Sequence, residues 1–187
     1  MEPQRGRIMA FVDEIPAGEI KAVYAYWLSK RANGRVPLKR DIDPTEFKPS
    51  WLPNLFMYRV ENGRFRCILV GTRIVQVFGR DETGMFLHEM LPPKHAASRQ
   101  RLFERAVRDR LPIYYFGPAL NPNPRYPRVS RLLLPVSSDG VSADHIFGIV
   151  KFGAAAEPRS EDDSLGGRFE PAKIVIATRQ DLDGPAS

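Results

Sequence analysis

The chain has 187 residues, 43% of them hydrophobic, and a formal net charge of +6. This length fits one domain with extensions, and the apolar share excludes wholesale disorder. No apolar run approaches the roughly 18–20 residues that cross a bilayer, and residues 1–19 contain acids and proline where a signal peptide needs a continuous apolar stretch. The single cysteine, Cys67, excludes an intrachain disulfide. We therefore expect a cytoplasmic protein without a membrane span.

The N-terminal part is predicted to be an arm followed by an amphipathic helix. Residues 1–15 show no sustained hydrophobic period. Residues 16–31 are predicted to be helical, because apolar side chains recur at i, i+3, i+4, i+7 and i+8. This stripe consists of Ile20, Val23, Tyr24, Trp27 and Leu28. Two interpretations stay open: the stripe packs on the domain's own sheet, or it forms the contact of a homodimer.

A polar, proline-bearing connector at residues 36–53 leads into a predicted β-hairpin. Two apolar runs, residues 55–60 and 64–70, flank a Glu-Asn-Gly turn at 61–63. Asn-Gly between apolar runs is a strong hairpin signal, because both residues tolerate positive φ. One face of the second strand is expected to meet the core, with the side chains of Phe65, Cys67 and Leu69.

The remaining elements predict an α+β fold. They are a short helix at 73–78, a short apolar segment at 85–91, a longer helix at 94–110, and strands at 113–116, 131–136 and 145–152. Antiparallel strands with the helices on one face are the natural arrangement for this order. Residues 154–187 are expected to be a partly disordered extension, in which 173–177 either adds a strand or stays an unattached tail.

Several stretches, in this order and spacing, resemble a PAS-like domain family of alphaproteobacteria, whose members are often single-domain PAS proteins. They are residues 26–31 (YWLSKR), 38–44 (LKRDIDP), 52–56 (LPNLF), 70–84 (VGTRIVQVFGRDETG), 131–140 (RLLLPVSSDG) and 145–149 (HIFGI). The resemblance implies a PAS-like domain at 16–153, with a five-stranded antiparallel sheet. It also implies a bacterial sensory and signal-transducing module that binds a small ligand or a partner protein. It names no cofactor, which stays unknown.

The residues offer little support for familiar PAS cofactors. Cys67 lies in a predicted strand without the Asn-Cys-Arg-Phe type of motif that covalent flavin chemistry needs, so we interpret it as a buried, inert thiol. Haem requires an axial ligand, commonly histidine. His88, His95 and His145 have no supporting motif and are interpreted as surface or helix-end residues. No metal site is predicted.

We expect no enzymatic activity and no catalytic residues. The Ser-Ser-Asp-Gly run at 137–140 is typical of a tight turn, and the chain has neither a nucleophile elbow nor a phosphate-binding glycine loop followed by lysine. No output domain is visible, so a signal is expected to pass to a separate protein. The alternative function is a nucleic-acid-associated regulator that uses the basic helix around 99–110, although a solvated helix face is the favoured interpretation.

A ligand is expected in an apolar pocket that carries a few polar groups. A packed core without a cavity is the open alternative. Tyr58, Tyr115 and Arg73 are the predicted polar contacts. The predicted lining residues are Tyr58, Phe65, Cys67, Leu69, Arg73, Val75, Phe78, Phe86, Leu102, Phe103, Tyr115, Leu134 and Ile146.

Overall fold

A computed structural model of the chain describes residues 10–119, 128–153 and 172–183. Its centre is an antiparallel sheet of six strands in the order β2-β1-β5-β4-β3-β6. The strands are β1 (Leu55–Glu61), β2 (Arg64–Val70), β3 (Ile113–Pro118), β4 (Arg128–Val136), β5 (His145–Phe152) and β6 (Lys173–Ile176). The sheet has one strand more than the five expected, because residues 173–176 pair with β3 and extend its edge.

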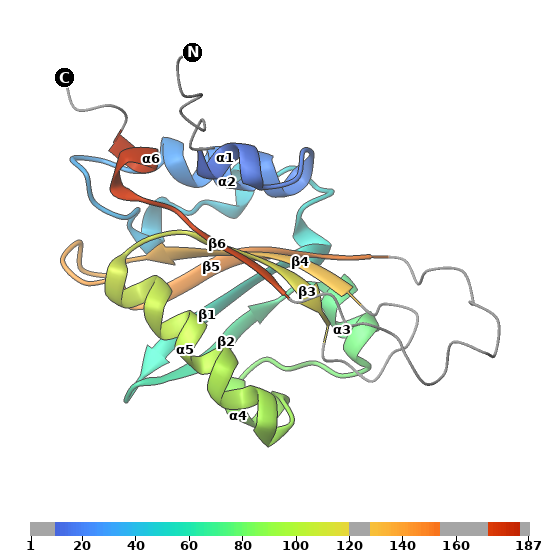
Figure 1. Cartoon of the computed structure of the whole chain (residues 1–187). Helices are drawn as coiled ribbons and strands as arrows, with labels where there is room; N and C mark the ends of the chain where they lie inside the picture. The colour runs from blue at the N-terminus through green and yellow to red at the C-terminus, as the bar shows by residue number, and fades with distance from the viewer. Residues whose placement is uncertain (1–9, 120–127, 154–171, 184–187) are drawn as a thin grey trace, which may run out of the picture.

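Helices cover both faces of the sheet, which corrects the prediction that they lie on one face (Figure 1). The helices are α1 (Phe11–Glu14), α2 (Glu19–Ser29), α3 (Thr72–Phe78), α4 (Leu87–Met90), α5 (Pro93–Asp109) and α6 (Arg179–Asp183), with 3-10 turns at Lys39–Asp41, Pro44–Glu46 and Leu52–Asn54. One layer contains α1, α2 and α6, and the other contains α3, α4 and α5. The physical reason lies in the central strands. Successive residues of β4 and β5 are buried, so both faces need a cover.

The apolar stripe of α2 packs on the chain's own sheet. Four of its five predicted members are buried and Leu28 is half-buried. Trp27 has no exposed surface, and its Nε1 donates a hydrogen bond to the carbonyl oxygen of Pro135 at 2.9 Å. Phe11 and Ile15, from the predicted arm, belong to the same core. Of the two interpretations of the stripe, the structure therefore shows the intramolecular one, and homodimerisation stays a prediction. Residues 1–9 lie outside the described residues.

The predicted hairpin forms, but a bulge in β2 changes which side chains share a face. Asn62 and Gly63 have positive φ, as the turn requires. Tyr58 pairs with Cys67 whereas Met57 pairs with Leu69, so Ile68 is an extra residue. A one-residue bulge reverses the alternation of side chains beyond it. Leu69 is therefore 43% exposed on the α2 face, and grouping it with Cys67 was wrong.

The long predicted helix is confirmed as α5, which ends at Arg110 in the left-handed conformation with φ 56°. Among the described residues, no helix combines the length and the hydropathy that crossing a bilayer requires.

Candidate functional site

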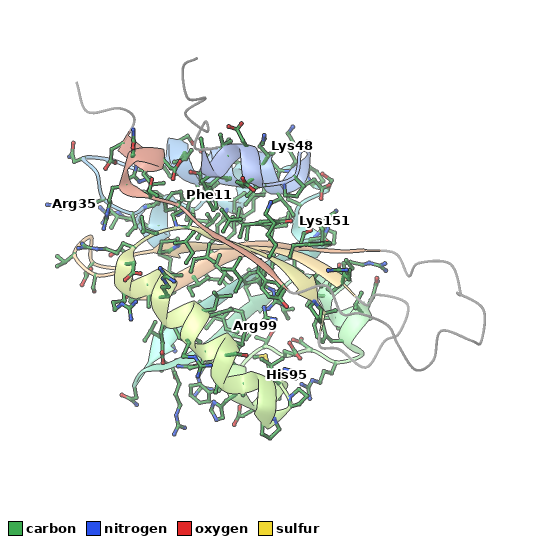
Figure 2. All side chains as sticks on the ribbon, in the orientation of Figure 1. Phe11, Arg35, Lys48, His95, Arg99 and Lys151 are labelled. Carbon is green, nitrogen blue, oxygen red and sulfur yellow. The ribbon has the colours of Figure 1, made fainter. Side chains whose placement is uncertain are left out.

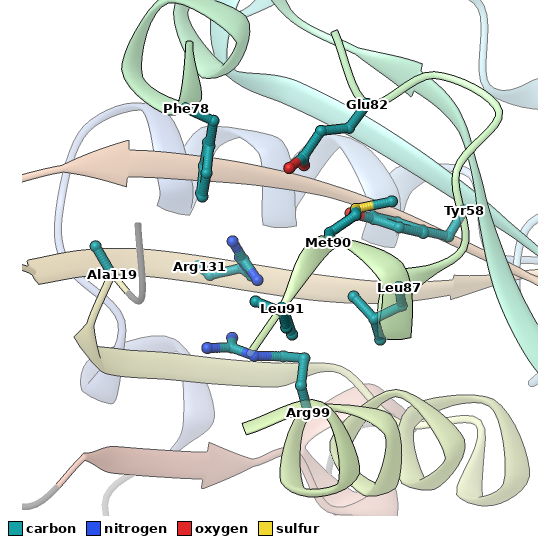
Figure 3. Close-up of a pocket in the computed structure, with 9 residues that line it drawn as sticks. All are labelled: Tyr58, Phe78, Glu82, Leu87, Met90, Leu91, Arg99, Ala119 and Arg131. Carbon is teal, nitrogen blue, oxygen red and sulfur yellow. The ribbon is translucent and has the colours of Figure 1, made fainter. Parts of the chain in front are cut away.

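A small cavity lies between the sheet and the layer of α3, α4 and α5 (Figure 3). Its volume is about 20 Å³, which leaves room for a group of roughly the size of a water molecule. The residues that line it come from β1, α3, the turn after α3, α4 and the residue that follows it, α5, the residue after β3, and β4. They are Tyr58, Phe78, Glu82, Leu87, Met90, Leu91, Arg99, Ala119 and Arg131.

Arg99 enters the cavity because it lies on the buried face of α5. Phe103 and Ala106 follow it at i+4 and i+7, and both have no exposed surface. Arg99 itself is only 4% exposed, on the inner side of the helix (Figure 2). Its guanidinium carbon lies 4.4 Å from the ring centroid of Tyr115. Burial, followed by the charge of Arg131, lowers the pKa of Arg99 to about 10. The side chain is still a cation at neutral pH, so a buried positive charge faces the cavity.

Arg131 reaches the cavity through the alternation of β4. Its neighbours at two residues' distance, Val129 and Leu133, belong to the core on the same face. The guanidinium carbon lies 5.7 Å from the ring centroid of Phe56. Among the described residues, Nε of Arg131 and Nη1 of Arg99 have no hydrogen-bond partner. An unpaired buried donor costs about 1–3 kcal/mol, and more when it is charged. The cavity therefore has a surplus of positive donors.

Glu82 supplies the negative charge of the cavity, and a second cation already shares it. The residue is 5% exposed. Nε and Nη2 of Arg80 each donate to its Oε1 at 3.2 Å. Burial raises the pKa of Glu82, while the charges of Arg80 and Arg131 act in the opposite direction. One carboxylate, bonded to Arg80, thus stands beside the charges of Arg99 and Arg131, and the balance at the cavity is positive.

Tyr58 closes the cavity on the β1 side. Its hydroxyl donates to Sδ of Met90 at 3.7 Å, a weak hydrogen bond. Burial raises the pKa of Tyr58, so the hydroxyl stays protonated. The Tyr58 hydroxyl could therefore donate to a ligand oxygen, which is a better acceptor than the thioether sulfur of Met90.

The predicted lining residues divide into three groups. Tyr58 and Phe78 line the cavity. Others form or pack against the apolar core around it without lining it: Phe65, Cys67, Leu102, Phe103, Tyr115 and Ile146. Tyr115 contributes indirectly, because its ring lies beside the Arg99 guanidinium. The remaining five lie elsewhere.

Leu134 and Leu69 face the other side of the sheet. Leu134 lies in the core under α2, because the side chains of β4 alternate and Leu133 takes the cavity side. Leu69 is displaced by the bulge at Ile68. The structure thus places both side chains away from this cavity, because the partner strands, which the sequence does not reveal, decide the face.

Val75, Phe86 and Arg73 are half-buried and do not line the cavity. In each short helix a neighbour takes the inward place, Ile74 in α3 and Leu87 in α4. The ring of Phe86 instead lies 4.2 Å from the guanidinium carbon of Arg66. Four-residue and seven-residue helices carry too few turns for their apolar period to fix the buried face.

Sequence reasoning missed the charged residues of the cavity. The basic helix was interpreted as a solvated face, which is correct for Arg101, Arg105 and Arg108 and wrong for Arg99. The available signal was its spacing from Phe103. Charged side chains are almost never fully buried unless they are paired. A charged residue on an apolar stripe is therefore a useful indication of a site.

The histidines and Cys67 form no metal or redox site among the described residues, where no group of three metal-ligating side chains occurs. His88 is exposed and His95 is half-buried. His145 is 4% exposed, with Nδ1 2.8 Å from Oδ1 of Asp144, so the expectation of a surface histidine was wrong. Burial raises the pKa of Cys67 to about 12, which keeps the thiol protonated.

The Ser-Ser-Asp-Gly run has the geometry of a turn. The hydroxyl of Ser137 donates to Asp139 Oδ1 at 2.9 Å and accepts from the backbone N–H of Gly140 at 2.8 Å. Asp139 also accepts from the backbone N–H groups of Val141 and Ser142. These bonds use the polar atoms of the run to hold the turn.

A larger hollow of about 450 Å³ lies on the α2 face, between the connector and the end of β2. Its walls include Phe47, Leu52, Met57, Leu69 and Phe147. Its volume is within the range of small-molecule sites, yet none of the described residues that line it is ionisable. Size favours this hollow, whereas convergent polar chemistry favours the cavity. The charged cavity is the stronger candidate site, because burying charged groups costs free energy that a purely structural core would avoid.

Comparison with known proteins gives one result. A family model described as PAS domain matches residues 17–151. No curated protein and no solved structure matches the chain significantly. The matched region contains α2, the strands β1–β4, β5 up to Lys151 and every residue that lines the cavity, and it excludes α1, β6 and α6.

Proposed function

The chain belongs to the PAS domain family, and on this premise we propose that it is a sensory and regulatory module whose cavity under α3–α5 binds a small ligand. One observation carries the proposal. Ionisable side chains from three separate elements, Arg99, Glu82 and Arg131, converge on an internal cavity. A core that served stability alone would avoid this arrangement, because burying charge is costly unless something is gained by it.

The surroundings of the cavity offer a route for a signal. Helix α4 has four residues and packs between α5 and β2. Arg80, which pairs with Glu82, also donates from Nη2 to the carbonyl oxygen of Met90 in α4 at 3.0 Å. A ligand that changes the charge balance at Glu82 therefore alters a bond that positions α4. Short elements with few contacts are the parts of a fold that move most easily.

Native mass spectrometry of the purified full chain, with an absorbance spectrum, tests the proposal. We expect a retained small molecule, or stabilisation by members of a metabolite library in a thermal-shift screen. Ala119→Leu, which fills the cavity, should abolish both effects in a folded protein. Ala97→Leu, at an exposed position of α5, is the matched control. A wild-type chain that retains nothing and responds to no compound would reject the proposal.

We also propose that the module has no catalytic activity and passes its signal to a separate protein. The protonated Cys67 thiol and the turn at Ser137 support the first statement, since neither supplies an activated nucleophile. Homodimerisation is tested by light scattering on the wild-type chain. A substitution of Trp27 would test folding and not dimerisation, because that side chain is fully buried.

The nucleic-acid alternative has lost part of its basis. Arg99 is buried, and Arg105 and Arg108 both pair with Asp109, at 3.3 and 2.9 Å. The exposed positive charge of α5 is therefore smaller than the sequence indicates. Salt-dependent retention on DNA would support this alternative, and no retention at low salt would reject it.

A further inference from the structure

We propose that the ligand of the cavity is a small anion, a carboxylate or an inorganic oxyanion, held by the guanidinium groups of Arg99 and Arg131. This inference rests on the proposed function and names the chemical class of the ligand. Its starting point is that Arg99 is 4% exposed, lines the cavity and has Nη1 without a hydrogen-bond partner among the described residues.

The charges around the cavity favour an anion. Arg99 and Arg131 both line it, and Glu82 is the only carboxylate among the described lining residues. One oxygen of that carboxylate already accepts two bonds from Arg80. A ligand with a single negative charge would supply acceptors for Nη1 of Arg99 and Nε of Arg131. Guanidinium groups match planar oxyanions particularly well, because their N–H donors lie in one plane.

The size and the walls of the cavity narrow the ligand further. A volume of about 20 Å³ admits a head group of few atoms. Phe78, Leu87 and Leu91 form apolar walls, which suit at most a short hydrocarbon chain behind that head group. Large or doubly charged anions fit less well, since Glu82 already places a negative charge at the cavity. We therefore expect the smallest anions, formate and nitrate, to bind more tightly than acetate, propionate or phosphate.

Substitution of Glu82 distinguishes an anion site from a cavity whose charged residues have only a structural role. Its carboxylate repels an incoming anion, while its neutral amide counterpart does not. Glu82→Gln is therefore expected to tighten anion binding, about threefold or more. Arg99→Met keeps an unbranched apolar stem and removes the guanidinium group with its charge, and should weaken binding by about tenfold or more.

The experiment is a calorimetric or NMR titration of the full chain with the sodium salts of formate, acetate, propionate, nitrate and phosphate. Ionic strength is held constant with sodium gluconate, an anion too large for the cavity. We expect saturable binding at one site, weakened in Arg99→Met and unchanged in Arg101→Met, which alters an exposed arginine of the same helix. Comparing formate, acetate and propionate with nitrate and phosphate shows whether the site prefers a carboxylate or an inorganic oxyanion.

Wild-type protein that binds none of these anions, or an Arg99→Met variant that binds them equally well, would overturn the inference. Should Arg99→Met fail to fold, Arg99→Lys keeps the charge with fewer donors and must still weaken binding. A neutral molecule found by native mass spectrometry, without anion binding, rejects this inference and leaves the proposed function standing. A chain that retains no small molecule and responds neither to these anions nor to any compound of the library rejects both.

Discussion

The two faces of the sheet differ in what they bury. Under α2, the large core side chains are apolar or aromatic, and the one polar atom of Trp27 is paired with a backbone carbonyl. Arg31 also lies there with Nε unpaired, but its other nitrogens bind the carbonyl oxygen of Leu182 and the carboxylate of Asp183. Under α5, a comparable apolar core surrounds Arg99, Glu82 and Arg131, whose polar atoms are only partly paired. The difference indicates that one face serves mainly stability, whereas the other gives up stability for a site that recognises charge.

The same strand contributes to both faces. In β4, Leu132 and Leu134 face α2, while Arg131 and Leu133 face α5. The alternation of side chains places a charge within a strand that is otherwise almost entirely apolar. Substitutions on the α2 face are therefore expected to lower mainly the stability, and substitutions of the charged residues on the α5 face to weaken mainly the binding of a ligand.

The largest expected effect is on the α2 face. Trp27→Ala removes a fully buried indole and its bond to Pro135, so the free energy of unfolding should fall by about 3–5 kcal/mol. Urea denaturation followed by circular dichroism measures it. Val12→Ala, at a 37% exposed site of α1, is the control. A loss below about 1 kcal/mol would show that this face is not the stabilising one.

A smaller loss of stability is expected from a substitution in β5, on the sheet face that the cavity lies against. A Cβ on Gly148 would lie 2.2 Å from the carbonyl oxygen of Leu132 and 2.4 Å from Cζ of Phe56. Gly148→Ala should therefore destabilise the fold by about 1–3 kcal/mol through overpacking. Gly153→Ala, whose Cβ would meet no atom closer than 3.6 Å, is the matched control. Equal unfolding midpoints for the two variants would contradict this packing.

A still smaller stability change is expected for Arg99→Met. The substitution removes a buried charge without leaving a large void, so unfolding free energy should change by less than about 1 kcal/mol, or rise. Comparison with Trp27→Ala in the same denaturation series measures the contrast between the faces. A loss as large as that of Trp27→Ala would mean that Arg99 is a structural residue.

The smallest effect concerns pH and Glu82. Burial raises the pKa of this carboxyl in the folded chain above its usual value of 4.5, so the folded state holds the proton more tightly than the unfolded state. Its contribution to stability is fully present below the unfolded pKa and is lost as pH rises through the folded pKa. Glu82→Gln has no titrating carboxyl at this position, so the variant does not lose this stability as pH rises. Urea midpoints should therefore diverge in favour of the variant with rising pH, and the opposite trend would contradict the shift.

Local signals explain what the sequence predicted correctly. The Asn-Gly turn defines the hairpin, and four turns of periodic residues define α5, because both depend on neighbours along the chain. The sixth strand and the helices on the second face depend on contacts between distant segments, such as β6 with β3. The apolar run at 173–177 indicates a possible strand, but no local pattern contains its pairing partner.

The candidate site was predicted only in its apolar part. Tyr58 and Phe78 follow from strand and helix patterns, whereas Arg99 and Arg131 were missed because charge is normally a mark of solvent exposure. Leu69 was misplaced because a bulge becomes visible only when the partner strand is known. The residues that give the site its chemistry are thus those that depart from the local pattern.

The most direct test of the charged cavity is a crystal structure of the full chain soaked in sodium bromide and measured at the bromine absorption edge. The account predicts an anomalous peak inside the cavity, within hydrogen-bonding reach of Nη1 of Arg99, and no such peak in crystals of Arg99→Met. Bromide found only on the surface, with water or nothing between Arg99 and Arg131, would contradict it.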